Sequence, residues 1–144
     1  MRKQDILENI KVRAGKDMLD FNDRSDKRVY ITIKKEILPK MARYLFNDVR
    51  ARFIIASGVD MRKNMEILYH FAVDSLGLII SLRVILEKSN LEIESLSSIM
   101  KAAEWIEREI HELLGVNFRG HPNPEHLLLK KDWPEGNYPL RRDQ

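Results

Sequence analysis

Two stretches in the middle of the chain carry a large apolar residue at every second position. The first runs from Met65 to Asp74 and the second from Leu78 to Leu86, with a turn at residues 74–77 between them. A period of two puts every second side chain on the same face of a strand, so each stretch has one face suited to a core. These faces hold Met65, Ile67, Tyr69, Phe71 and Val73 in the first stretch, and Leu78, Ile80, Leu82, Val84 and Leu86 in the second. The pattern predicts an antiparallel hairpin.

The residues before this hairpin predict one more strand and two helices. Val29, Ile31 and Ile33 alternate within Arg28 to Lys34, which indicates a strand. Apolar residues recur at helical spacing from about Gln4 to Met18 and from about Lys35 to Val49, where Pro39 falls in the first turn and is tolerated. The expected buried stripes are Ile6, Leu7, Ile10 and Ala14 in the first helix, and Leu38, Met41, Leu45 and Val49 in the second.

A short apolar strand from Arg52 to Ser57 and a charged turn from Gly58 to Asn64 complete this part of the pattern. Period-two alternation favours antiparallel pairing, and the first strand and its helix add a crossover. We therefore predict an α+β fold, with a mixed, mainly antiparallel sheet flanked by helices.

A third helix is expected from Ser97 or Ser98, which are good N-cap residues, to Gly115, a good residue to follow a helix end. Its buried stripe would be Ile99, Ala103, Ile106, Ile110 and Leu113, with Trp105 beside it. The other face carries Glu104, Glu107, Arg108, His111 and Glu112. Their i,i+4 spacing predicts an exposed ladder of ion pairs. The alternative is that Arg108 and its acidic neighbours contact a partner or fix the segment that follows.

That segment is a tail rich in proline. Four of the five prolines of the chain lie in it, and each removes a backbone donor, so a regular helix or central strand is excluded. It is nevertheless too apolar for a solvated linker, because it carries Phe118, Leu127, Leu128, Leu129, Trp133, Tyr138 and Leu140. We expect an α+β domain over residues 1–115 and an extended partner-binding tail over residues 116–144.

Composition excludes several classes of protein. The 144-residue chain has no cysteine, so it lacks the thiolates that an iron–sulfur cluster normally needs and cannot form a disulfide. Its net charge of +3 is a small difference between 25 basic and 22 acidic residues of interleaved sign, which does not favour nucleic-acid binding. Its apolar runs are too short to span a membrane.

Two kinds of site chemistry are conceivable and neither is favoured. Glu109 and Glu112 could form an acid–base pair on the third helix, but no Ser/His/Asp set, Gly-rich phosphate loop or cofactor fingerprint accompanies them. His121 and His126, with Glu125 or Asp132, offer metal ligands, but two prolines separate the histidines, so their spacing is not diagnostic. The alternative is a His121 side chain that is hydrogen-bonded within a rigid turn. We expect no catalytic, cofactor-binding or metal-binding residues in this chain.

The region from Glu107 to Asp143 resembles the 30 kDa subunit of respiratory complex I and of related membrane-bound energy-converting [NiFe] hydrogenases. That family ends its core helix in E-R-E, an acidic residue and two apolar residues, then has a histidine and closes with P-L-R-[KR]-D. The matching residues are Glu107, Arg108, Glu109, Glu112, Leu113, Leu114, His121, Pro139, Leu140, Arg141, Arg142 and Asp143. The chain departs at Glu125, where the family usually has a basic residue or proline, and at Gln144, where it usually has an aromatic residue.

The resemblance implies a cofactor-free structural subunit, not an enzyme on its own, in the cytoplasmic peripheral arm of a complex I-like redox assembly. It implies contacts with a large subunit, which carries a quinone or nickel–iron site, and with a small iron–sulfur subunit. An energy-converting hydrogenase or related archaeal-type complex is the first reading, and an NADH:quinone oxidoreductase is the second. A stand-alone binding module is the competing class. The partner-binding residues would be Glu107, Arg108, Glu109, Glu112, His121, Trp133, Tyr138, Pro139, Leu140, Arg141, Arg142 and Asp143.

Overall fold

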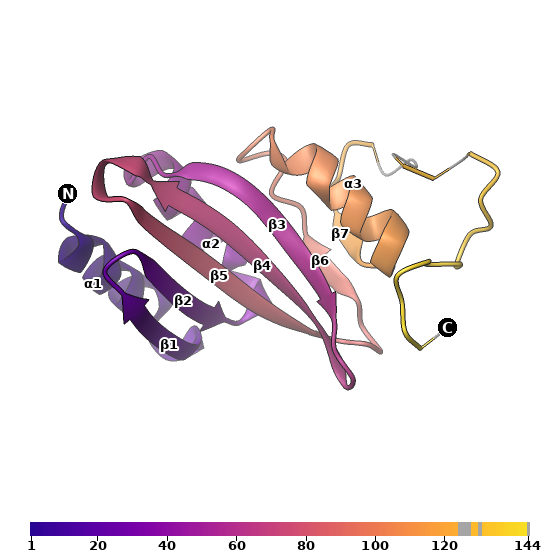
Figure 1. Ribbon diagram of the computed structural model, residues 1–144, viewed down its shortest axis with the longest axis horizontal. Helices are drawn as coiled ribbons and strands as arrows, with labels where there is room; N and C mark the ends of the chain where they lie inside the picture. The colour runs from indigo at the N-terminus through magenta and orange to yellow at the C-terminus, as the bar shows by residue number, and fades with distance from the viewer. Residues whose placement is uncertain (124–127, 130, 144) are drawn as a thin grey trace.

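A single five-stranded sheet forms the centre of the molecule (Figure 1). The structure, a computed structural model, describes residues 1–123, 128–129 and 131–143. The strands are β1 (Met18–Ser25), β2 (Arg28–Ile33), β3 (Arg52–Asp60), β4 (Asn64–Val73) and β5 (Leu78–Glu87), in the spatial order β1-β2-β5-β4-β3. Within this sheet β2 and β5 are parallel neighbours, and the other three pairs are antiparallel. The predicted α+β class with a mixed, mainly antiparallel sheet is confirmed.

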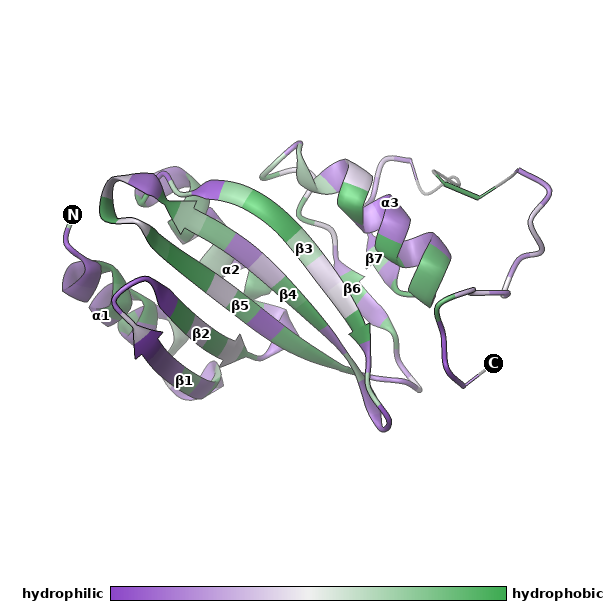
Figure 2. Cartoon of the chain, in the orientation of Figure 1, coloured by the Kyte–Doolittle hydropathy of each residue, from purple (hydrophilic) through white to green (hydrophobic). Residues whose placement is uncertain are grey.

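The predicted hairpin is β4 and β5. Their register pairs Met65 with Leu86, Tyr69 with Leu82 and Val73 with Leu78, so the two apolar faces lie side by side over the core. All ten alternating apolar residues of these strands are buried. The bands of alternating hydropathy along β4 and β5 are visible in Figure 2.

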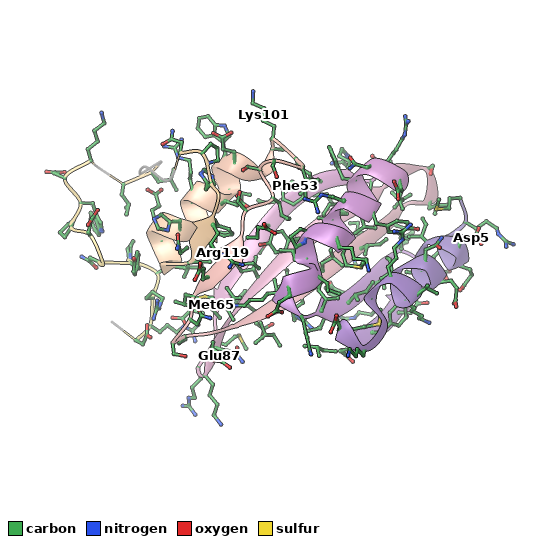
Figure 3. All side chains as sticks on the ribbon, turned by 180° about the vertical axis from the view of Figure 1, so that it is seen from behind. Asp5, Phe53, Met65, Glu87, Lys101 and Arg119 are labelled. Atoms are coloured by element: carbon green, nitrogen blue, oxygen red, sulfur yellow. The ribbon has the colours of Figure 1, made fainter. Side chains whose placement is uncertain are left out.

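Two helical segments cover one face of the sheet, the far side in Figure 1 and the near side in Figure 3. Helix α1 (Lys3–Ala14) buries its predicted stripe in full, but it ends before Met18, where β1 begins. Helix α2 (Leu38–Arg43) is only the middle of the helix expected from Lys35 to Val49. A 3-10 turn (Lys35–Ile37) precedes it and a π-helical turn (Tyr44–Asp48) follows.

The sequence pattern does not reveal three of the strands. At the edge of the sheet, β1 buries none of its residues, so it lacks the alternation by which strands are recognised. Two short strands, β6 (Glu92–Glu94) and β7 (Asn117–Arg119), form a separate parallel pair. Strand β3 also extends three residues further than predicted, to Asp60, and shortens the expected charged turn before β4, which begins at Asn64.

Helix α3 (Ala103–Leu114) begins later than Ser97 or Ser98. The serines do not act as N-caps, because turns follow them and Ala102 occupies the N-cap position. The helix ends where predicted, at Gly115, which has a left-handed φ of 81°. Within the described part of the chain, no helix is long and apolar enough to cross a membrane.

Helix α3 packs beside β3 at Gly58. A Cβ atom at this position would lie 2.5 Å from the Leu114 Cδ1 atom and 3.3 Å from the Ile110 Cγ2 atom. The missing side chain therefore lets the helix approach the strand closely, at the end of the molecule from which the tail departs (Figure 1).

Arg50 provides a test of the second helical segment. It has a φ of 61°, and the N–H of Ala51 closes the helix end by donating to the Leu45 carbonyl at 2.8 Å. Glycine adopts this left-handed conformation without the Cβ penalty, so Arg50→Gly should raise the free energy of unfolding by about 1 kcal/mol in chemical denaturation. The matched change Arg43→Gly, inside α2, should lower it by about the same amount. Destabilisation by both changes would contradict the assigned helix end.

Candidate partner-binding site on helix α3 and the tail

Two of the acidic residues on α3 lie inside the molecule. The exposed fraction is 0% for Glu107 and 2% for Glu112. The predicted ladder of exposed ion pairs is therefore wrong for these two residues. Their charge predicts a place on the solvent-exposed face of the helix. The loop before α3 and the tail cover that face, and they supply hydrogen-bond donors to both carboxylates.

Glu107 ties the helix to the loop before it. Its carboxylate accepts a hydrogen bond from the Ser95 hydroxyl at 2.5 Å and another from the Leu96 N–H at 2.8 Å. Burial raises the pKa of Glu107, and these two hydrogen bonds oppose the increase because they stabilise the charged form. The residue thus fixes the loop that leads into α3.

His121 fixes the first turn of the tail. Its Nε2–H donates to the Glu104 carbonyl at 2.8 Å, while its Nδ1 accepts the Asn123 N–H at 3.0 Å. This is the hydrogen-bonded histidine in a rigid turn, the alternative to a metal ligand. Glu125 and His126 of the metal hypothesis lie outside the described residues. Within residues 1–123, 128–129 and 131–143, no group of three His, Asp or Glu residues could hold a metal ion.

Glu112 holds the tail at a second point. Its carboxylate accepts the N–H of Leu128 at 2.6 Å and is 3.4 Å from the N–H of Leu129. A buried carboxylate that accepts backbone N–H groups is an anchor for irregular backbone. This arrangement accounts for Glu112 without an acid–base pairing with Glu109.

The last residues of the tail return to the end of α3. The Leu140 N–H donates to the Leu113 carbonyl at 3.0 Å, and the Arg141 Nη1–H donates to the Leu114 carbonyl at 3.2 Å. Carbonyl groups at a helix end lack partners within the helix, so the tail supplies them. The Tyr138 ring lies over Gly115, where a Cβ atom would be 2.6 Å from it.

The tail also has an internal ion pair. Arg141 binds Asp143 through two parallel hydrogen bonds of 2.7 and 2.6 Å. The hydrogen bonds from Arg141 lower the pKa of Asp143 to about 2. Arg142 differs from Arg141, because its side chain is exposed and its N–H is held by the carboxylate of Asp60.

The remaining predicted residues lie on or near the surface. Glu109 and Arg108 are half-buried, and the Arg108 guanidinium lies 5.6 Å from the centre of the Trp105 ring. Trp133 is half-buried, and its indole N–H donates to the Asn137 carbonyl at 2.7 Å within the tail. Pro139 and Leu140 are exposed. A small pocket at the root of the tail is lined by Glu107, Arg108, His111, Asn117, Phe118 and His121.

The structure refines the expected limit between body and tail. Val116 and Phe118 are buried in the common core, and β7 contains Phe118, so the residues directly after Gly115 pack with the body. On packing alone the tail begins near Gly120. A separate partner-binding role for the tail stays a prediction.

Sequence reasoning misses Trp105 and Asp60. The helical pattern puts Trp105 beside the buried stripe, yet its exposed fraction is 62%. Asp60 falls in the expected solvated turn, although it is buried and holds the tail. The exposure of Trp105 could have been inferred from its place among charged residues on α3, whereas the contact of Asp60 joins residues 82 positions apart and has no local signal.

Comparison with known proteins gives one family match. The family described as "Respiratory-chain NADH dehydrogenase, 30 Kd subunit" matches residues 31–144. The C subunit of the F(420)H(2) dehydrogenase of Methanosarcina mazei is 30% identical over 99% of this chain and 92% of that protein. Component G of hydrogenase-4 from Escherichia coli is also 30% identical over 99% of this chain, but only 26% of that protein is covered.

A third relative is the J subunit of the NAD(P)H-quinone oxidoreductase of Prochlorococcus marinus (strain MIT 9215), 42% identical over 56% of this chain. This match spans 49% of that protein, about half its length. Among solved structures, the fold resembles a chain of an archaeal membrane-bound sulfane sulfur reductase, with a TM-score of 0.84 and 21% identity over 97% of this chain and 84% of that one. A trypsin-resistant fragment of Nqo5 gives a TM-score of 0.72 and 17% identity over 85% of this chain and 99% of that one.

The pairing of Arg141 with Asp143 predicts a measurable titration. Arg141→Gln should raise the pKa of Asp143 from about 2 towards its ordinary value of 3.8, because the charged donor is lost. The carboxyl ¹³C shift of Asp143, followed by NMR against pH, measures this pKa. Because the pKa of Asp143 is depressed, the ion pair stabilises the tail fully at pH values above the ordinary pKa of 3.8. This stabilisation is lost as the pH falls through about 2.

The matched control is Arg142→Gln, which removes a neighbouring arginine whose side chain is exposed. The pKa of Asp143 should then stay near 2. An equal rise in both variants would show that the general positive charge of the tail, rather than the pairing with Arg141, sets this pKa.

Proposed function

Since this chain belongs to the family of the respiratory-chain NADH dehydrogenase 30 Kd subunit, we propose that it is a structural subunit in the peripheral arm of a complex I-like, membrane-bound redox complex. Its role is to hold a large catalytic subunit and a small iron–sulfur subunit next to each other. It contributes no cofactor of its own to electron transfer. The tail and the exposed side of α3 form the surface that meets these partners.

One observation carries the proposal: Glu107 and Glu112 of the motif hold the segments on either side of α3 in place, while large apolar side chains near them stay exposed. Glu107 and Glu112 each accept hydrogen bonds from the chain itself, an arrangement suited to positioning rather than to proton transfer. Beside them, Trp105 and Leu140 have exposed fractions of 62% and 57%. Exposed large apolar side chains on a rigid support are the usual anchors of protein interfaces.

The names of the relatives support a shared role. The relatives are subunits of an F(420)H(2) dehydrogenase, an NAD(P)H-quinone oxidoreductase and a hydrogenase. These complexes differ in the electron donor or acceptor that they are named for, yet each contains a protein similar to this chain. A subunit shared by such different reactions is better suited to assembly than to recognition of one substrate. We favour an energy-converting hydrogenase or related archaeal-type complex, because the match to the Methanosarcina mazei relative covers almost the whole of both chains.

The alternative within this class is the equivalent subunit of an NADH:quinone oxidoreductase. In either case the chain would lie on the cytoplasmic side and reach the membrane only through its partners. The alternative of another class is a stand-alone binding module with no redox partner. Purification of the tagged chain from its native host separates these readings, because each complex would bring its own large subunit and the stand-alone module would bring none.

The exposed apolar surface gives the test by mutation. Trp105→Ser and Leu140→Ser should each lower the yield of co-purified large subunit by about tenfold or more, the effect of losing an interface anchor. The melting temperature of the isolated chain should change little, because neither side chain is part of the core.

Val12→Ser is the matched control. Val12 is a large apolar residue with an exposed fraction of 74%, but it lies on α1, at the opposite end of the molecule from the tail (Figure 1). The control should assemble like the wild type. If Trp105→Ser and Leu140→Ser also retain full yield, the partner surface lies elsewhere.

A further inference from the structure

Asp60 is a buried acid outside the motif that nevertheless contacts the tail. It is the last residue of β3, next to the tip of the β3–β4 hairpin, and its side chain is 3% exposed. One carboxylate oxygen accepts the Arg142 N–H at 2.6 Å, and the other forms an ion pair with the Lys88 ammonium. A buried carboxylate at a hairpin tip is unusual, because such tips are ordinarily solvated.

Electrostatics keeps this carboxylate charged. Burial on its own would raise the pKa of Asp60, but the Arg142 N–H and the Lys88 ammonium outweigh it, so the pKa lies below its ordinary value. The acceptor is therefore ionised at neutral pH and forms the stronger, charge-assisted kind of hydrogen bond with the tail backbone.

Lys88 extends the contact into a network. It follows β5, and its ammonium lies between the carboxylates of Asp60 and Asp143, 3.9 Å from the latter. Asp143 in turn binds Arg141, which reaches the carbonyl at the end of α3. Charges of alternating sign thus connect the end of the sheet, the end of the tail and the end of the helix.

This network closes the tail into a loop. The tail is tied to α3 at His121 and again at Leu128, then swings away from the body and returns to the end of the sheet (Figure 1). Figure 3 labels Met65 and Glu87, which mark the strand ends to which it returns. Proline-rich backbone cannot order itself through regular structure, so its conformation depends on these anchors.

We propose that Asp60 and Lys88 are positioning residues for partner binding: together with the Arg142 N–H they form a clasp that orders the tail loop before a partner arrives. The proposal rests on the proposed function, since the loop is taken to meet a partner. A loop ordered in advance loses less conformational entropy on binding than a free tail, so the clasp increases affinity without touching the partner.

The backbone N–H of Arg142 offers a test that distinguishes the clasp from a general effect on the stability of the domain. Arg142→Pro removes the N–H that Asp60 accepts and leaves the body of the domain and the Asp60–Lys88 pair unchanged. Arg142→Ala removes the same side chain and keeps the N–H. Hydrogen–deuterium exchange of the full chain then reports the clasp, through the amides of Leu140 and Arg141, while the amides of β4 and β5 report the body.

Arg142→Pro should accelerate exchange at Leu140 and Arg141 about tenfold or more, with the melting temperature and the exchange of β4 and β5 unchanged. Arg142→Ala should match the wild type. The double variant Asp60→Ala/Lys88→Met, which removes the acceptor of the Arg142 N–H and both charges of the ion pair together, should behave like Arg142→Pro. The control for the double variant is Glu87→Ala, which changes an exposed residue next to Lys88. Equal exchange in Arg142→Pro and Arg142→Ala would overturn the clasp.

Co-purification of the large subunit from the native host tests the role in binding. Arg142→Pro should reduce the yield several-fold relative to Arg142→Ala. Faster exchange with an unchanged yield would overturn the positioning role. A wild-type chain that brings down no oxidoreductase subunit would overturn the proposed function itself, and the exchange results would still decide whether the clasp exists.

Discussion

A proline-rich tail cannot satisfy its backbone through regular structure of its own, so the tail of this chain depends on hydrogen bonds to α3 and to the end of β3. Glu112 on α3 and Asp60 at the end of β3 provide buried acceptors for tail N–H groups. In return the tail donates to the carbonyls at the end of α3, from the Arg141 side chain and the Leu140 N–H. Each of these groups would be costly to bury alone, because an unpaired charge or carbonyl loses its hydration. Helix and tail therefore depend on each other.

This dependence links the fold to the proposed role. The hairpin of β4 and β5 forms a rigid base, Gly58 lets α3 lie close to β3, and α3 then presents Glu107 and Glu112 to the segments on either side of it. What remains exposed is a group of large side chains, including Trp105 and Leu140, on a support that is already ordered. In the proposed function, this surface fixes the spacing of the partners that carry the redox centres.

The elements with one buried and one open face could be predicted from the sequence, and those without such a contrast could not. The period of two in β4 and β5 reflects one fully buried face and an opposite face that is mostly only half-buried, whereas β1 is an edge strand with no buried residue. Helical periodicity predicts α3, and Gly115 marks its end. On this helix, however, the charge of a side chain does not predict whether it is exposed. Glu107 and Glu112 are buried because donors distant in the sequence satisfy them, which no local pattern reveals.

Hydrogen–deuterium exchange of the wild-type chain, alone and within its complex, tests the central claim most directly. The amides of residues 128, 129 and 140–142 should already be protected in the isolated chain, because the body holds them. The amides of residues 131–137 should gain protection only in the complex, where a partner covers the loop. Fast exchange at residues 140–142 in the isolated chain would contradict the ordering of the tail by its own domain, and unchanged exchange at residues 131–137 in the complex would contradict its use in assembly.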